Sequence, residues 1–204
     1  LNLLVTSFQE RVHGIMTSLR VLASSPEVIS GEWSRMKPLL SSFNRGYEGL
    51  AMYVEPDGDY YTVQRDRTGL NLSDRGYFPA LLKGEEVLGY QVLSRSTGNR
   101  SVVFATTVLK EGNISGFVGI SAFLDEWNFE LISDFKQLPG VHFYAFDGQN
   151  TLALSDDTSL LLGSLEVPVP GMSKRLAALD RDNGDFLFSA NDVQIGRASC
   201  RERV

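Results

Sequence analysis

Apolar residues at the start of the chain recur with alternating steps of four and three. This spacing keeps one face of an α-helix apolar over about three heptads, and no proline interrupts it before Pro26. The positions are Leu1, Val5, Phe8, Val12, Ile15, Leu19 and Leu22. We therefore predict a long first helix, whose apolar seam packs either against its own domain or against a second copy of the chain.

A second helical pattern runs from Trp33 to Phe43, where Pro38 predicts a kink or a break. Short apolar runs separated by turn-forming residues then predict strands at 50–54, 60–63, 90–93, 101–109 and 116–123, and a short helix at 77–83. Asp57-Gly58 joins the first two strands, because Asp-Gly readily adopts the positive φ angles of a tight turn. Helices followed by antiparallel strands indicate an α+β fold with the helices on one face of the sheet.

The second half of the chain repeats part of this pattern. A helix is predicted at 125–135, then a strand–Asp-Gly–strand unit over 141–154, a helix at 173–179 and a strand at 184–189. This weak internal repeat predicts a second, smaller module that stops short of its final strands. We place the boundaries at 1–47 for the two helices, 48–137 for the first module and 138–194 for the second.

Residues 195–204 lack a turn or a strand pattern of their own. The run from Ile195 to Val204 resembles the in-frame translation of a common sequencing adapter, and the alternative is a genuine basic tail. Under the first interpretation the single cysteine, Cys200, lies outside the natural segment, which then has no disulfide or cysteine–metal chemistry. The chain also begins without Met, and we interpret it as a fragment.

Charge and composition narrow the classes of function. The formal charge of −6 disfavours a surface that follows nucleic-acid phosphates, and a hydrophobic share of 43% is enough for a sizeable core. No apolar run approaches the roughly 20 residues that a membrane-spanning helix needs.

Signals for metal or catalytic chemistry are weak. Neither His13 nor His142 has a cysteine or a helical partner at metal-ligand spacing. The acidic run Asp180–Asp185 departs from a calcium loop, because Gly184 falls one place early and Asn191 stands at the bidentate glutamate position. Glycine spacing matches neither phosphate-binding nor nucleophile-elbow motifs. We therefore expect no cofactor, no metal and no enzymatic activity.

The stretch from Leu72 to Pro79 is the strongest candidate site. Arg75 is followed at +2 and +3 by Tyr77 and Phe78, which places a fixed cation beside flat apolar faces. A guanidinium matches a carboxylate bidentately, and the rings exclude water from the pair. The alternative is an arginine stacked on the surface or placed at a helix start.

The segment up to Gln194 resembles the double Cache family of extracytoplasmic sensors. The resemblance rests on the long first helix, Met52-Tyr53-Val54 with its Asp-Gly turn, Leu72 to Phe78, Ser94-Arg95-Ser96-Thr97-Gly98 and Gly116-Phe117-Val118-Gly119-Ile120-Ser121. It implies a long helix followed by two PAS-like modules, the membrane-distal one binding a small molecule. It also implies tethering, by flanking membrane helices outside this segment, to a kinase, cyclase or chemotaxis output.

In the amino-acid-binding branch of that family, an Arg-x-Trp-Tyr unit holds the ligand carboxylate and a later aspartate holds its ammonium. Arg75-Gly76-Tyr77-Phe78 matches the carboxylate half, whereas the aspartate position falls at about Ser121, which supplies no countercharge. The resemblance therefore implies a small organic acid without an ammonium group. The expected ligand-binding residues are Arg75, Tyr77, Phe78, Ser94, Thr106, Ser121 and Tyr61. Thr106 and Ser121 could equally face solvent, and Tyr61 could belong to the core.

These observations favour an extracytoplasmic, periplasmic sensing domain of a membrane-anchored signalling protein, with a possible homodimer through the first helix and no nucleic-acid partner. The alternative is a structural or protein-interaction module without a ligand. An enzyme is the third and least favoured class.

Overall fold

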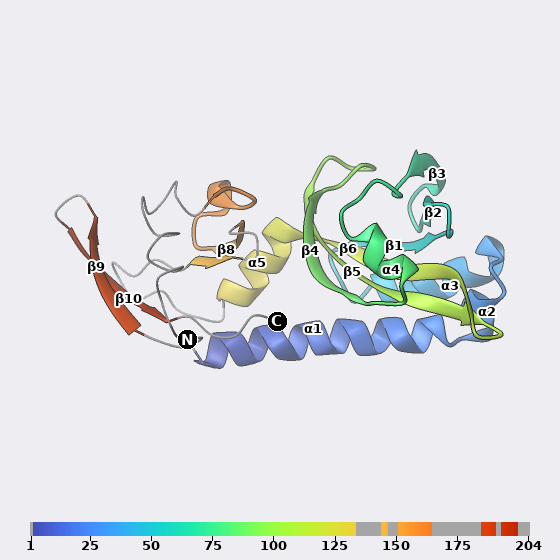
Figure 1. Cartoon of the computed structure of the whole chain (residues 1–204), viewed down its shortest axis with the longest axis horizontal. Helices are drawn as coiled ribbons and strands as arrows, with labels where there is room; N and C mark the ends of the chain where they lie inside the picture. The colour runs from blue at the N-terminus through green and yellow to red at the C-terminus, as the bar shows by residue number, and fades with distance from the viewer. Residues whose placement is uncertain (1, 134–143, 147–150, 165–184, 191–192, 200–204) are drawn as a thin grey trace. The chain divides into compact units, whose positions relative to one another are not determined.

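The computed structural model describes residues 2–133, 144–146, 151–164, 185–190 and 193–199 (Figure 1). The chain divides into two compact units, one of Thr6–Trp127 and one of Leu1–Val5 with Asn128–Val204. Among the described residues, no helix combines the length and the apolarity that crossing a bilayer requires.

The Thr6–Trp127 unit is built on a six-stranded antiparallel sheet in the order β3-β2-β1-β6-β5-β4. The strands are β1 (Gly49–Val54), β2 (Asp59–Thr62), β3 (Asp66–Asn71), β4 (Val87–Leu93), β5 (Arg100–Lys110) and β6 (Asn113–Phe123). The predicted Asp-Gly turn joins β1 to β2, where Gly58 adopts a φ of +96° and Glu55 N–H donates to the Asp59 carbonyl at 2.7 Å. The α+β assignment is confirmed, with helices followed by an antiparallel sheet.

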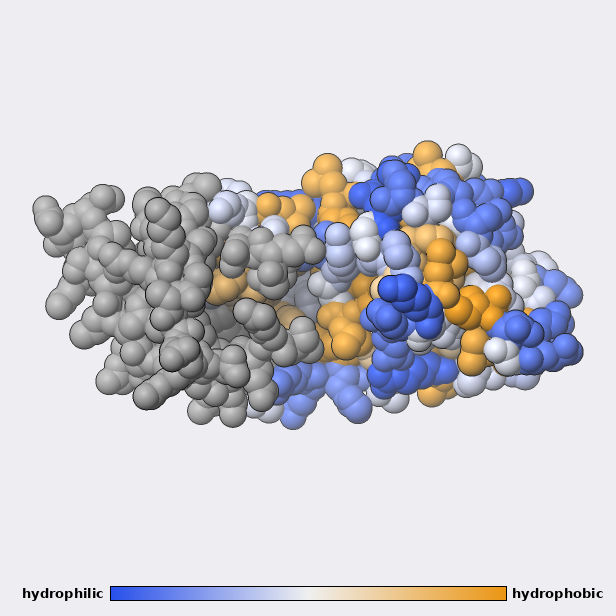
Figure 2. All heavy atoms as spheres, viewed as in Figure 1, coloured by the Kyte–Doolittle hydropathy of each residue, from blue (hydrophilic) through white to orange (hydrophobic). Residues whose placement is uncertain are grey.

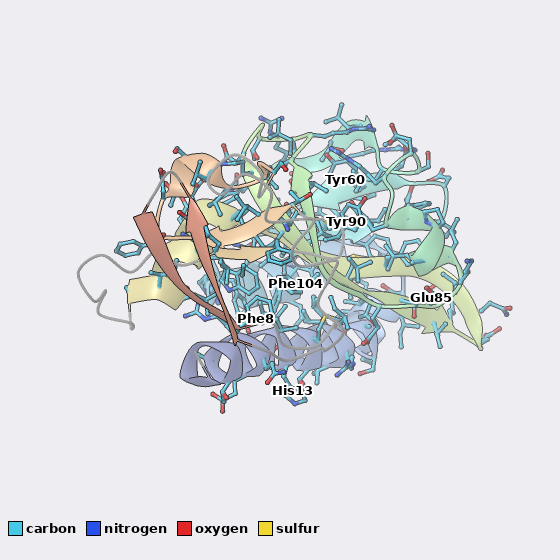
Figure 3. All side chains as sticks on the ribbon, turned by 60° about the vertical axis from the view of Figure 1, so that its left-hand side comes forward. Phe8, His13, Tyr60, Glu85, Tyr90 and Phe104 are labelled. Atoms are coloured by element: carbon cyan, nitrogen blue, oxygen red, sulfur yellow. The ribbon has the colours of Figure 1, made fainter. Side chains whose placement is uncertain are left out.

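Three helices precede the sheet: α1 (Asn2–Ala23), α2 (Pro26–Ile29) and α3 (Trp33–Asn44). Ile15, Leu19 and Leu22 of the predicted seam are at most 7% exposed, so this part of the seam packs within its own unit. Figure 3 shows Phe8 and Phe104 on the sheet side of α1, whereas His13 points away from the sheet.

An aromatic cluster lies between α1 and the face of the sheet that packs against it. The Trp127 ring lies 5.4 Å from Phe8 and 5.2 Å from Phe104, measured between ring centroids. Pro38 lies inside α3 and does not end it, so of the predicted kink or break the structure contradicts the break. The helix therefore continues to Asn44. The Asn44 side chain donates a hydrogen bond to the Gly49 carbonyl and accepts one from the Ala51 N–H, both in β1.

A second hydrophobic cluster covers the opposite face of the sheet. It is capped by α4 (Phe78–Leu82), and its buried members include Met52, Tyr60, Tyr77, Phe78, Leu81, Val103 and Phe117. Figure 3 labels Tyr60 and the partly buried Tyr90 on this side. The surface of the described residues mixes hydrophilic and hydrophobic side chains (Figure 2), and scattered apolar residues such as Val21 and Leu109 are ordinary for a folded protein.

The second unit contains α5 (Leu124–Ser133, which begins in the first unit), β7 (Tyr144–Phe146), β8 (Leu152–Ser155), a 3-10 turn η1 (Thr158–Leu160), β9 (Asp185–Ala190) and β10 (Val193–Ser199). β7 and β8 pair antiparallel, as the predicted strand–turn–strand unit requires. Asn128 of α5 exchanges two hydrogen bonds with the Ser155 backbone, at 2.8 and 2.9 Å.

The sequence does not predict every strand of this unit. β10 pairs with β9 and covers Val193–Ser199, where no strand was predicted, because the run has little apolar alternation. The predicted helix at 173–179, His142 and residues 180–184 of the acidic run lie outside the described residues.

Candidate functional site

A small cavity lies on the sheet face opposite α1, between the sheet and the segments around Arg75 and Ser94. Its volume is about 20 Å³. It is lined by Leu50, Met52, Tyr60, Thr62, Leu72, Arg75, Tyr77, Val92, Ser94, Arg95, Ser96, Val103 and Ser121. Of the predicted site residues, the structure therefore brings together Arg75, Tyr77, Ser94 and Ser121.

Strand register decides which side chains reach the cavity. Ser121 of β6 pairs with Leu50 of β1 and with Val103 of β5, so these three form one row on the cavity face. Thr106 pairs with Val118 and lies three positions after Val103 on β5. Because side chains alternate along a strand, Thr106 points to the opposite face of the sheet, which packs against α1. There its hydroxyl donates to Glu86 Oε1 at 3.1 Å. Thr106 is buried but does not line the cavity.

Arg75 is half-buried at the edge of the cavity. Its Nη2 donates to the Leu93 carbonyl at 2.9 Å, and it forms no ion pair with any described residue. A turn holds the backbone, since Arg75 N–H donates to Leu72 and its carbonyl accepts from Phe78. At Gly76 a Cβ atom would overlap the Tyr90 hydroxyl, so the absence of a side chain allows this close approach.

Tyr77 and Phe78 differ in role. Tyr77 is 5% exposed, lines the cavity and packs edge-on to Tyr90 at 5.3 Å. Burial raises the pKa of Tyr77 to about 12, so its hydroxyl remains a donor at neutral pH. Phe78 packs edge-on to Phe117 at 5.6 Å in the core and does not line the cavity.

Tyr61 also lies away from the cavity. It pairs with Tyr53, while its neighbours Tyr60 and Thr62 point to the cavity face. Its ring stacks on Trp33 at 5.2 Å, and its hydroxyl bonds Glu55 at 3.4 Å. Tyr61 thus joins β2 to α3.

Polar lining residues beyond those predicted are Tyr60, Thr62, Arg95 and Ser96. Arg95 donates through Nη2 to the Asp74 carboxylate at 2.5 Å and through Nη1 to the Asn71 carbonyl. The hydrogen bond from Arg95 lowers the pKa of Asp74. Arg95 directly follows Ser94, which the sequence analysis predicted as a binding residue. This position beside a predicted residue is the sequence signal that could have identified Arg95.

The cavity lining favours an anion. It contains two arginines and six hydroxyl groups, and no described lining residue carries a carboxylate. An ammonium group would therefore meet cations and find no countercharge in the lining. A volume of about 20 Å³ holds roughly one water molecule, so a larger ligand requires the surrounding segments to move apart.

Oxygen ligands for a cation occur together at one place in the described part of the chain. Glu55, Asp57 and Asp59 bring their carboxylates within 4.8 Å of one another at the β1–β2 turn. Asp59 is already bonded to Asn71 and to Arg67, which lower its pKa. The cluster is thus partly neutralised within the protein.

Several solved structures share this fold at low sequence identity. The ligand-binding domain of the Pseudomonas fluorescens chemoreceptor CtaA, in complex with L-isoleucine, matches 95% of this chain and 79% of its own, with a TM-score of 0.74 and 13% identity. The Campylobacter jejuni chemoreceptor Tlp3 domain, in complex with 4-methylisoleucine, matches 94% and 81%, with a TM-score of 0.67 and 17% identity. The Pseudomonas aeruginosa amino-acid chemoreceptor PctC domain, in complex with GABA, matches 92% and 84%, with a TM-score of 0.69 and 17% identity.

These comparisons establish the fold: the chain has the α+β, PAS-like fold of Cache-type chemoreceptor ligand-binding domains. The sequence matches no protein-family profile and no curated protein.

Proposed function

We propose that the chain is the extracytoplasmic ligand-sensing domain of a membrane-bound signalling protein, and that it binds a small organic acid through Arg75. One observation carries the proposal: Arg75 lines a hydroxyl-rich cavity on the sheet, has no ion pair with a described residue, and shares a lining without carboxylates. The fold of chemoreceptor ligand-binding domains supports the class of protein.

The ligand chemistry follows from the donors. Arg75 offers a planar fork to a carboxylate, and the protonated Tyr77 hydroxyl with the Ser94 and Ser121 hydroxyls adds neutral hydrogen bonds. The related domains were solved with amino acids or GABA, which carry an ammonium group. The lining here offers that group no partner, so an acid without an amine suits it better.

Signal output in this proposal is a population shift. A ligand changes the packing of α1 only if it binds one arrangement of the domain more tightly than the other. A physical link exists, because Arg20 of α1 donates to both Glu86 carboxylate oxygens, at 2.8 and 2.6 Å, and Glu86 lies directly before β4. Widening the cavity at β4 would therefore act on α1 through this ion pair.

A thermal-shift screen with a panel of small mono- and dicarboxylic acids tests the proposal. We expect at least one acid to raise the Tm of the wild type and to leave Arg75→Ala unchanged. Arg67→Ala is the matched control, since Arg67 is an exposed arginine paired with Asp59 and does not line the cavity. Equal stabilisation of wild type and Arg75→Ala by the same acid would refute the proposal that Arg75 binds the ligand carboxylate.

The small cavity supports a second candidate, a structural or protein-interaction module that binds no small molecule. A cavity of about 20 Å³ admits no organic acid without rearrangement. The same screen separates the two candidates, because this module predicts that no acid in the panel raises the Tm of the wild type.

A further inference from the structure

Two arginines of the cavity lining form hydrogen bonds in opposite directions between the segment before α4 and the end of β4. Arg75, from the segment before α4, donates to the Leu93 carbonyl at the end of β4. Arg95, from the turn after β4, donates back to Asn71 and Asp74. Both arginines line the same cavity.

Only one of these groups is already matched by a carboxylate. Asp74 accepts from Arg95 Nη2 at 2.5 Å, whereas Arg75 bonds a neutral carbonyl. The Asp74 side chain is 64% exposed and that of Arg95 34% exposed. Exposed ion pairs contribute little, because water solvates both partners when they separate. A ligand carboxylate at the cavity can therefore compete with Asp74 for Arg95.

We infer that the ligand is a short dicarboxylate, of which Arg75 binds one carboxylate and Arg95 the other after Asp74 releases it. This inference rests on the proposed function, since it places Arg75 as the first anchor. Asp74 then acts as an internal competitor that occupies Arg95 in the absence of the ligand. Its release also removes one of the two contacts by which Arg95 ties the Asn71–Asp74 segment to the turn after β4, and this loosens the segment at the cavity.

The test compares acids of equal carbon number. Calorimetric titration of the wild type with malonate against propionate, and with succinate against butyrate, measures the preference for two carboxylates over one. We expect at least one dicarboxylate to bind roughly tenfold or more tightly than its partner, since a second charge-assisted contact is gained. Arg95→Gln should reduce this preference to near one. Asp74→Asn should increase dicarboxylate affinity roughly two- to fivefold, and monocarboxylate affinity less.

Matched controls exclude a merely structural role. Arg67→Gln and Asp66→Asn change residues of other exposed ion pairs, and the Asp66 side chain is 58% exposed, similar to Asp74. Both controls should keep the preference of the wild type. A loosened loop would weaken both classes of acid equally, whereas the inference predicts a change in their ratio.

The possible failures are distinguishable. If both classes of acid bind equally, Arg95→Gln changes neither, and Arg75→Ala abolishes both, the dicarboxylate inference is wrong and the proposed function stands. If no acid binds the wild type or Asp74→Asn, the proposed function fails and the inference falls with it.

Discussion

At the residue scale, the account depends on how Arg75 is held. An arginine carries five N–H donors, and the bond to the Leu93 carbonyl occupies only part of this set. That bond fixes the side chain at the cavity edge without neutralising its charge. The hydroxyl groups of the lining are neutral. They can therefore orient a bound carboxylate without competing with it for the Arg75 guanidinium.

Tyr77→Phe tests the neutral part of the site. The ring packing against Tyr90 remains, and only the donor is removed, so we expect the affinity for the bound acid to fall roughly three- to tenfold. Because the pKa of Tyr77 is raised to about 12, wild-type affinity for succinate should be nearly constant from pH 6 to about pH 10. Calorimetric titration across this range measures both effects.

The control for that variant is Tyr61→Phe, which removes a hydroxyl bonded to Glu55 outside the cavity. Its affinity should equal that of the wild type. An equal loss in both variants would mean that Tyr77 acts through stability and not through the ligand.

Of the predicted binding residues, Arg75 lines the cavity, whereas the strand residues Tyr61 and Thr106 lie on the other face of the sheet. Counting back from the Lys110–Asn113 pair at the turn would put Thr106 opposite Phe117, on the same face as Ser121. A register shift at Val108 instead pairs Thr106 with Val118, which turns it to the helix side. Such a bulge has no clear sequence signature. The sequence therefore could not show to which face of the sheet Thr106 points.

At the scale of elements, α1 contributes to stability through one face. Leu19 is fully buried and Val21, two residues on, is 65% exposed. We expect Leu19→Ala to lower the free energy of unfolding by about 2–5 kcal/mol, because it leaves a cavity in the core. Val21→Ala should change it by less than about 0.5 kcal/mol. Urea unfolding of both variants measures this, and similar losses would contradict the packing described for α1.

The contact between α1 and the start of β4 predicts a pH dependence. Hydrogen bonds from Arg20 lower the pKa of Glu86, with a further contribution from Thr106. A lowered folded-state pKa stabilises the protein above the unfolded-state pKa of about 4.3 and loses this effect as the pH falls through the folded-state value. Glu86→Gln should therefore lower the Tm by roughly 2–4 °C at pH 7, and by progressively less below about pH 4.

Glu85→Gln is the control for this variant, since Glu85 is the exposed neighbour in the same turn (Figure 3). Thermal unfolding from pH 3 to 8 should show a pH-dependent difference for Glu86→Gln alone. A difference that does not change with pH would indicate a packing effect and not an ionic one.

Some elements could be predicted from the sequence and others could not. The strands β1, β5 and β6 are apolar runs bounded by turns, and the structure confirms them. The sequence predicts no strand where β3 lies, because Asp66–Asn71 shows no apolar alternation, and in the structure these residues are exposed or half-exposed. Its strand conformation comes from pairing with β2, which a local pattern does not record.

At the scale of the whole molecule, the order of the elements predicts the α+β class, and the family resemblance adds the PAS-like fold. A long helix, a shorter helix and an antiparallel set of strands allow few arrangements, and the solved chemoreceptor domains share the one observed. Fold alone does not define a ligand, since function depends on particular side chains. The interpretations of residues 195–204 and of an incomplete second module stay predictions, which the uninterrupted gene sequence would test.

The most direct test of the central claim observes the Arg75 guanidinium itself. In protein labelled with ¹⁵N-arginine, the Arg75 Nε–Hε resonance is assigned by its loss in Arg75→Lys, and succinate or propionate is then titrated. We expect this resonance to shift along a saturable curve that gives the Kd measured by calorimetry, while the Arg67 resonance stays in place. Calorimetric binding of either acid without any shift of the Arg75 resonance would contradict the claim.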